Sequence, residues 1–274
     1  MPPVLKVGAV MYDPKVSVIW EIIRDFFDAQ GAPIDTVFYA TYDIQNEGLL
    51  SGAIDIAWNS PLAWLDAQRR SANRCRAIAM RDTDRDRISY IVARRGGDLR
   101  TLRDLKGRTI ATGAIDSPQA TLIPLGRLRR EGLRPGIDVT VRRFDVLVGK
   151  HGDHVGGERD ALACLTSGEA AACAMLDLNW DGWTVDGTID PAEFMIIGET
   201  DRFDHCVFTV RQDLDPVAEK TWLDALFAMR YDDPAHREMM DLEGLKAWLP
   251  GRTTGFAPLT AAVETERFFA PASS

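Results

Sequence analysis

The chain is organised around the stretch LRDLKGRTIATGAIDSPQATLIPLGRLRREG, residues 102–132. Its pattern predicts a short helical turn at Leu102–Leu105, a strand at residues 108–112 and a helix at residues 118–130. Ser117 is a good N-cap, and Pro118 stands at the first helical position, where its missing N–H group costs nothing. The start of such a helix carries unbonded N–H groups and a partial positive charge, which suit it to an anion. An ordinary capped helix without a ligand explains the same residues.

Strands and helices alternate on both sides of this stretch, which indicates an α/β protein with mostly parallel sheets. Two sets of similar size, joined near residues 90–96 and again near residues 205–212, predict two lobes connected by two crossing strands. The expected strands are residues 4–10, 34–40, 54–58, 77–80, 88–93, 108–112, 139–144, 171–176, 194–198 and 205–211. The expected helices of the second half are residues 118–130, 155–167, 215–229, 234–249 and 259–269.

Composition restricts the class of protein. The chain has 274 residues and a net charge of −9, from 32 Lys and Arg against 41 Asp and Glu, which argues against nucleic acid as a partner. No stretch is apolar for the length of a membrane span, so no membrane insertion is expected. The four cysteines suggest no disulfide framework, and we expect free thiols. The N-terminal MPPVLKVGAV lacks signal-peptide features, which predicts a cytoplasmic protein as written, or a periplasmic one if a signal was removed.

Four loops after predicted strands are candidates for ligand binding, because ligands of open α/β sheets bind at the carboxyl ends of strands. Hydroxyl, amide and backbone N–H groups at the helix start can hold a phosphate or carboxylate without a lysine. The candidate residues of the four loops are Trp58, Asn59 and Ser60; Ser117, Gln119 and Thr121; His151 and His154; and Asp177.

Each candidate also has an interpretation without a ligand. His151 and His154 stand in a Gly/Asp-rich loop where exposed histidines are common, and the spacing supplies no four-ligand zinc site, so no metal is predicted. The carboxylates and indoles of residues 177–183 suit either a polar ligand with a ring or amine, or a surface turn. Cys206 and His205 look like a nucleophile pair, but adjacent strand residues point to opposite faces, which predicts that they do not pair.

Four blocks of sequence, in this order and spacing, carry a resemblance to a known family. They are LLSGAIDIAWNSPLAWL at residues 49–65, LRDLKGRTIATGAIDSPQATLIPLGRLRREGL at 102–133, HGDHVGGERDALACLTSGEAAACAML at 151–176 and HCVFTVRQDL at 205–214. The chain resembles the type 2 periplasmic binding proteins, specifically the phosphate/phosphonate-binding branch of the ABC-transporter solute receptors.

The resemblance implies two α/β lobes, hinged by two strands, that close on a small anion. It implies a discontinuous first lobe of residues 1–92 and 206–274 and a second lobe of residues 93–205. The ligand contacts that it implies are Trp58, Asn59, Ser60, Tyr90, Ser117, Gln119, Thr121, His151 or His154, and Asp177.

We therefore predict a protein that binds a small anion, such as a phosphonate, phosphate ester or carboxylate, without a cofactor. If the chain is exported, ABC-transporter membrane subunits are possible partners. The alternative is a cytoplasmic enzyme of the lyase or precursor-synthesis type on the same fold, with Asp177, His151 or His154 as acid or base. A third, weaker hypothesis is a ligand-sensing domain that reports closure to a partner protein.

Overall fold

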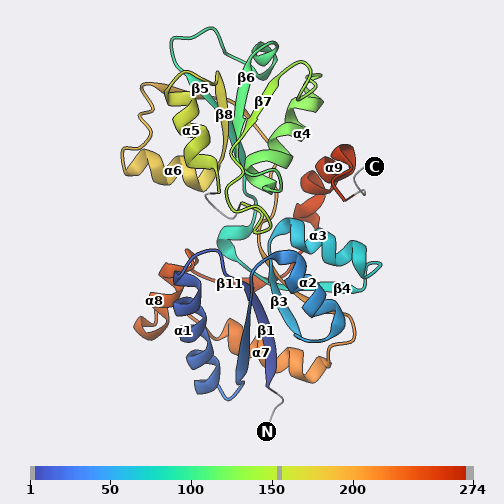
Figure 1. The fold of residues 1–274 in the computed structure, drawn as a ribbon. Helices are drawn as coiled ribbons and strands as arrows, with labels where there is room; N and C mark the ends of the chain where they lie inside the picture. The colour runs from blue at the N-terminus through green and yellow to red at the C-terminus, as the bar shows by residue number, and fades with distance from the viewer. Residues whose placement is uncertain (1–3, 153–155, 270–274) are drawn as a thin grey trace. The chain divides into compact units, whose positions relative to one another are not determined.

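The computed structural model describes residues 4–152 and 156–269 and divides into two compact units (Figure 1). The first unit comprises the described chain up to Arg85 and resumes at Asp204–Gly255. The second unit comprises Asp86–Phe203 and the chain that follows Gly255. The chain therefore passes between the units three times, where two crossings were predicted.

These divisions differ from the predicted boundaries at residues 92/93 and 205/206. Strand β5 (Ser89–Arg94) belongs to the second unit because it pairs there with two strands, β8 (Ala172–Leu176) and β9 (Phe194–Glu199). Helix α9 (Ala257–Glu266) also belongs to the second unit, because it packs on helix α4 (Ile123–Arg130) rather than on the first sheet.

The sheet of the first unit has six strands in the order β11-β4-β10-β3-β1-β2. Strand β1 pairs in parallel with β2 and β3, as predicted, whereas β10 runs antiparallel between β3 and β4, and β11 is antiparallel to β4. The strands are β1 (Leu5–Val10), β2 (Ile34–Tyr39), β3 (Ile56–Asn59), β4 (Cys75–Arg81), β10 (Val207–Arg211) and β11 (Trp248–Pro250).

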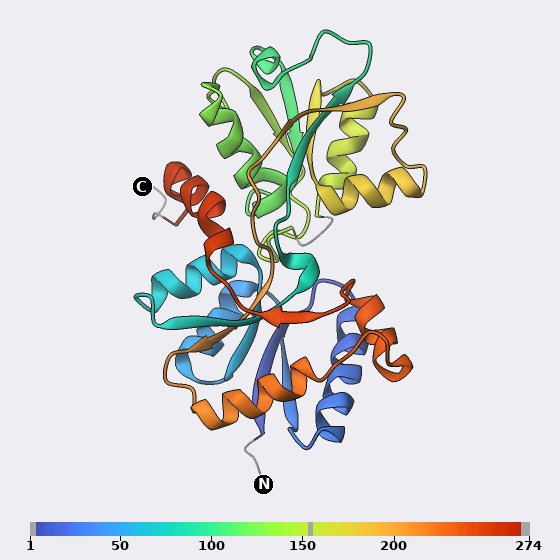
Figure 2. The same cartoon turned by 180° about the vertical axis from the view of Figure 1, so that it is seen from behind.

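Helices cover both faces of this sheet. The larger core includes side chains of α1 (Lys15–Ala29), α7 (Pro216–Phe227) and α8 (Pro234–Leu242), and Figure 2 shows α7 lying over the strands. At its centre lies Phe208 of β10, whose ring centroid is 4.5 to 6.2 Å from the ring centroids of four tryptophans. A smaller apolar cluster on the sheet joins α2 (Tyr42–Ser51) and α3 (Pro61–Arg70).

The sheet of the second unit has the order β7-β6-β8-β5-β9, and its central strands are apolar on both faces. Ile91, Ile110 and Ala172 pack in the cluster that contains α4, and their neighbours Val92, Ala111 and Cys173 pack in the opposite cluster, because successive strand residues alternate in direction. The remaining elements are β6 (Thr109–Thr112), β7 (Thr140–Arg143), β8 (Ala172–Leu176), β9 (Phe194–Glu199), α5 (Glu158–Thr166) and α6 (Asp177–Val185).

The helix predicted at residues 118–130 is not continuous. It begins with a π-helical turn, Pro118–Leu122, and becomes α-helical only at α4. Pro124 explains the break, since a straight α-helix would require its absent N–H group to donate to the carbonyl of Ala120. That carbonyl instead accepts a hydrogen bond from the N–H of Gly113, at 3.3 Å. Such π turns inside helices are frequent at functional sites.

Two further expectations are wrong. The stretch at residues 176–183 is not a loop, because α6 begins at Asp177 directly after β8. The helix predicted at residues 234–249 ends at Leu242, and Trp248–Pro250 instead forms the edge strand β11. The four cysteines are buried free thiols, as predicted. Among the described residues, no helix is long and apolar enough to cross a membrane.

Candidate functional site

The predicted helix start is buried and tied to the sheet of the second unit. Ser117 caps it, as predicted: its Oγ accepts a hydrogen bond from the N–H of Ala120 at 3.1 Å. The carbonyl oxygen of Gln119 accepts a hydrogen bond from Oγ of Ser89 at 2.6 Å. Ser117, Gln119 and Thr121 expose only 0%, 1% and 2% of their surfaces. The geometry of the helix start is therefore fixed by packing rather than left to an exposed loop.

Hydroxyl groups at this position have hydrogen-bonding capacity to spare. Oγ1 of Thr112, at the end of β6, and Oγ1 of Thr121 are buried and have no hydrogen-bond partner among the described residues. An unsatisfied buried group of this kind costs about 1–3 kcal/mol. Oγ of Ser117 accepts the capping bond with a lone pair and keeps its own hydrogen to donate. These hydroxyls suit a group rich in acceptor oxygens.

A fully buried carboxyl group, that of Glu158, lies beside the helix start. Its Oε2 accepts hydrogen bonds from the N–H of Leu176 at 2.9 Å and from Nδ2 of Asn179 at 2.7 Å. Burial raises the pKa of Glu158 to about 7. Hydrogen bonds from Asn179, from the Leu176 N–H and from the Gln119 side chain lower this pKa, but their effect is smaller. Glu158 thus joins the end of β8, the start of α5 and the helix start in one polar cluster.

Asp177 and Tyr90 lie at the same edge of the sheet, because β5 begins opposite the end of β8. Oδ2 of Asp177 is 3.5 Å from the guanidinium of Arg87, and burial is the main cause that raises the pKa of Asp177. The ring of Tyr90 meets that of Trp180 edge to face, with centroids 6.3 Å apart. Burial, followed by the charges of Asp177 and Asp181, raises the pKa of Tyr90. We call the rings of Tyr90 and Trp180 the aromatic corner, and the carboxylates of Asp177 and Asp181 place negative charge beside it.

The loop that carries the predicted histidines is held by Asp116. The carboxylate of Asp116 accepts a hydrogen bond from the N–H of Gly149 at 2.6 Å and another from the N–H of His151. Burial raises the pKa of Asp116. His151 is half-buried and has a φ of 56°, which is uncommon for a residue with a side chain. His154 lies outside the described residues, so a ligand contact from either histidine stays a prediction.

The loop with Trp58, Asn59 and Ser60 belongs to the first unit, and all three side chains have structural partners there. The Trp58 ring is in the core, with its centroid 4.5 Å from that of Phe208, and the Arg81 guanidinium lies 5.2 Å from the Trp58 ring centroid. Oγ of Ser60 caps α3 by accepting from the N–H of Ala63. These contacts favour a structural role for Trp58, and a ligand role for this loop stays a prediction.

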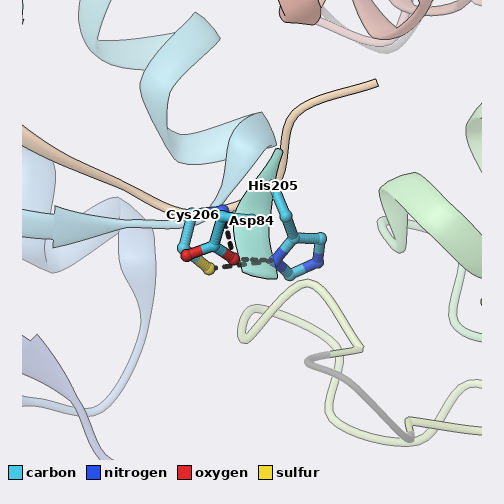
Figure 3. A group of neighbouring side chains, drawn as sticks. All are labelled: Asp84, His205 and Cys206. Atoms are coloured by element: carbon cyan, nitrogen blue, oxygen red, sulfur yellow. Dashed lines mark hydrogen bonds and ion pairs between the residues drawn. The ribbon is translucent and has the colours of Figure 1, made fainter. Parts of the chain in front are cut away.

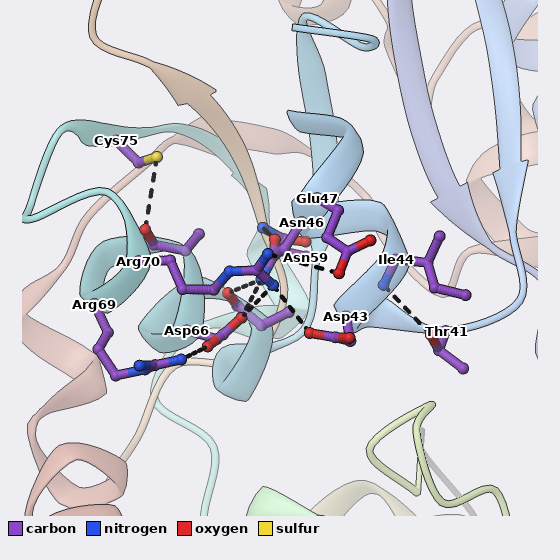
Figure 4. A network of polar contacts seen from close by, with 12 residues as sticks. Thr41, Asp43, Ile44, Asn46, Glu47, Asn59, Asp66, Arg69, Arg70 and Cys75 are labelled. Carbon is purple, nitrogen blue, oxygen red and sulfur yellow. Dashed lines mark hydrogen bonds and ion pairs between the residues drawn. The ribbon is translucent and has the colours of Figure 1, made fainter. Parts of the chain in front are cut away.

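Asn59 takes part in a buried amide network (Figure 4). Its Oδ1 accepts from Nε2 of Gln45 at 2.8 Å, and its Nδ2 donates to Oδ1 of Asn46 at 3.2 Å. Asn46 in turn donates to Asp66, whose carboxylate pairs with Arg70 at 3.3 Å. The network ties the end of β3 to α2 and α3.

The prediction that His205 and Cys206 do not pair is wrong. Nδ1 of His205 lies 3.1 Å from Sγ of Cys206 (Figure 3). Strand β10 begins only at Val207, so the alternation of strand side chains does not apply to the two residues before it. Asp84 completes the group, with its Oδ1 3.5 Å from Nδ1 of His205.

The structure therefore brings most of the predicted residues of the second unit together and leaves those of the first unit in a separate body. The helix start, Tyr90 and Asp177 share one edge of the second sheet. Sequence reasoning missed Glu158 and Arg87. The signal for Glu158 was its place at the start of a helix after a Gly-Gly pair, but its burial depends on Asn179 and on β8.

Two solved structures have the same fold as this chain. PhnD1 from Prochlorococcus marinus, solved with methylphosphonate, matches with a TM-score of 0.72 at 16% identity, over 97% of this chain and 99% of that chain. XAC2383 from Xanthomonas citri, solved with ATP, matches with a TM-score of 0.76 at 17% identity, over 98% and 99% of the two chains. At these identities the likeness shows the fold, which is that of the two-lobed periplasmic binding proteins.

The family is shown by a match to its sequence model. Residues 12–260 match the family described as ABC transporter, phosphonate, periplasmic substrate-binding protein, and the chain belongs to this family. An uncharacterised protein of Haemophilus influenzae is 51% identical over 39 residues, which cover 14% of this chain. That alignment spans 55% of the length of the Haemophilus protein. None of these comparisons supports the alternative of a lyase or precursor-synthesis enzyme.

Proposed function

We propose that this protein is the substrate-binding component of an ABC transporter for an organic phosphonate or a related phosphate ester. We further propose that residues 117–121 hold the acidic group of the ligand. The observation that carries the proposal is the buried helix start of Ser117, Gln119 and Thr121, which a hydrogen bond from the N–H of Gly113 to the carbonyl of Ala120 joins to the end of β6. Membership of the phosphonate-binding family supports the same ligand class.

The chemistry of this position suits an oxyanion. Helix starts attract negative charge through their N–H groups and the helix dipole, so a lysine is not required. A ligand oxygen that accepts from the hydroxyls of Thr112 and Thr121 would satisfy two buried donors that have no partner among the described residues.

The aromatic corner suggests what the rest of the ligand carries. Asp177 supplies a carboxylate, and Tyr90 and Trp180 supply ring faces beside it. Carboxylates and aromatic faces together favour an ammonium group, through charge and through cation–π attraction. We therefore expect a phosphonate with an amine or polar ring substituent to bind more tightly than methylphosphonate. Asp177 then acts in binding and not as a general acid or base.

The proposed setting follows from the family. Its members are periplasmic substrate-binding proteins. We propose that this chain works in the periplasm and delivers its ligand to the membrane subunits of the transporter.

Isothermal titration calorimetry tests the proposal with methylphosphonate, 2-aminoethylphosphonate, inorganic phosphate and ethanesulfonate as ligands. Thr121→Val removes a buried hydroxyl and keeps the shape of the side chain. We expect the affinity for the best phosphonate to fall about tenfold or more, which corresponds to about 1.4 kcal/mol. Ser117→Ala is expected to weaken binding similarly, and also to lower stability through loss of the cap.

Asp215→Ala is the matched control, because Asp215 caps α7 in the first unit, also just before a proline. It is expected to cost a similar stability and to leave the affinity unchanged. Equal affinity of wild type and Thr121→Val for every ligand that binds would contradict the assignment of the helix start. Binding of none of the four ligands would contradict the proposed ligand class.

A further inference from the structure

A carboxylate, an imidazole and a thiol meet at one point of the first unit (Figure 3). Nδ1 of His205 lies 3.1 Å from Sγ of Cys206 and 3.5 Å from Oδ1 of Asp84. The three residues are almost fully buried, with 1% to 3% of their surfaces exposed. We propose that Asp84, His205 and Cys206 bind one borderline-soft divalent cation of the Zn²⁺ class.

Two of the three ligand-atom separations are close to those around a tetrahedral ion, and all three ligand atoms lie within 4.8 Å of one another. With Zn–N and Zn–O bonds of about 2.0–2.1 Å and a Zn–S bond of about 2.3 Å, the N and S ligands of a tetrahedral site lie about 3.5 Å apart, and N and O ligands about 3.3 Å apart. The observed separations of 3.1 Å and 3.5 Å require movements of a few tenths of an ångström. In zinc sites with three protein ligands, a water molecule takes the fourth position.

The charges around the group favour a dication that displaces one proton. Arg81 donates through Nε and Nη2 to Asp84 at 2.7 and 2.9 Å, and through Nη1 to Glu243 at 2.9 Å. The fixed charges of one guanidinium and two carboxylates sum to −1. A bound dication adds +2, and loss of the Cys206 thiol proton to solvent adds −1, so the buried group becomes neutral.

The surrounding hydrogen bonds hold the ligand residues in place. The N–H of His205 donates to the carbonyl of Asp84 at 2.7 Å, and the N–H of Cys206 donates to its Oδ1 at 3.2 Å. The contacts of Arg81 orient the same carboxylate, which is the usual role of groups behind a metal ligand. Asp84 lies just before the first passage between the units, and His205 just after the second. A bound ion would therefore fasten both connecting segments to the first unit.

Cobalt(II) titration of the chelator-treated full chain tests this site. We expect one equivalent to give the visible d–d absorption of tetrahedral cobalt and a near-ultraviolet thiolate-to-cobalt band, both displaced by Zn²⁺. Cys206→Ser is expected to lose the thiolate band, and His205→Ala to lose the tetrahedral spectrum. Cys75→Ser is the control, because Cys75 is another buried thiol of the first unit and lies outside the group. Circular dichroism of each variant checks that it folds.

The absence of a thiolate band in wild type, or its persistence in Cys206→Ser, would overturn the proposal. If Cys206→Ser does not fold, X-ray absorption of the wild-type protein with one equivalent of Zn²⁺ decides. A coordination shell with one sulfur and two or three N/O ligands supports the site. A shell without sulfur, or no retained zinc after desalting, refutes it.

Discussion

Replacing Glu158 by Gln should make the protein more stable at alkaline pH. Glu158 is fully buried, and its Oε2 accepts from the Leu176 N–H and from Asn179, bonds that the amide oxygen of Gln can also accept. The change removes a carboxyl group that must ionise inside the protein. It keeps the volume and one acceptor oxygen.

The size and the sign follow from proton linkage. The pKa of Glu158 rises from 4.5 to about 7 on folding, so between these values the folded protein holds a proton that the unfolded chain has lost. Stability of the wild type therefore falls as pH rises through this window and levels off above pH 7. At about 1.4 kcal/mol per pKa unit, the full difference is about 3 kcal/mol.

The assay is urea unfolding of the wild type and Glu158→Gln, followed by tryptophan fluorescence from pH 4.5 to 8.5. We expect the free energy of unfolding of the wild type, relative to the variant, to fall by about 3 kcal/mol across this range. Asp160→Asn, an exposed change in the first turn of the same helix, is the control and should leave the wild-type profile unaltered. A difference between wild type and Glu158→Gln that does not vary with pH would refute the reasoning.

Two further predictions concern packing. Phe208→Ala should lower the free energy of unfolding by about 3–5 kcal/mol, because Phe208 is 1% exposed and its ring packs against four tryptophan rings. Urea unfolding measures this loss, and a loss below about 1 kcal/mol would contradict that packing. Gly255→Ala should cost about 1–3 kcal/mol, because a Cβ there would lie within 2.4 Å of the Asp204 carboxylate. Gly97→Ala, whose Cβ would meet only a carbonyl at 3.6 Å, is its control in thermal unfolding.

The two α/β sets and most elements follow from the sequence because their signals are local. Apolar periodicity marks α1 and the central strands, and Ser-Pro pairs mark the starts of α3 and of the π turn. Pro124 was also a local signal, and the rule against interior proline predicts a break near it. Pro124 has no N–H group to donate to the carbonyl of Ala120. What the sequence does not reveal is that the N–H of Gly113 donates to this carbonyl instead.

Other features depend on tertiary contacts. Helix α6 contains Gly182, and its apolar residues show little helical periodicity, so the sequence alone does not predict it. Tertiary packing stabilises this helix more than helix propensity does, because Trp183 is buried in an apolar cluster of the second unit. The contact between His205 and Cys206 was not predicted, because both residues were placed inside the strand. Strand β10 in fact begins at Val207, which pairs with Asn59, the last residue of β3. The burial of Glu158, and with it the pKa, likewise depends on residues far along the chain.

The central claim is that residues 117–121 hold the acidic group of a phosphonate. A crystal structure of the protein with the phosphonate that binds best in calorimetry tests it most directly. We expect phosphonate oxygens within hydrogen-bond distance of the hydroxyls of Ser117 and Thr121. A phosphonate bound elsewhere, with the Thr121 hydroxyl making no contact to it, would show that residues 117–121 are not the binding site.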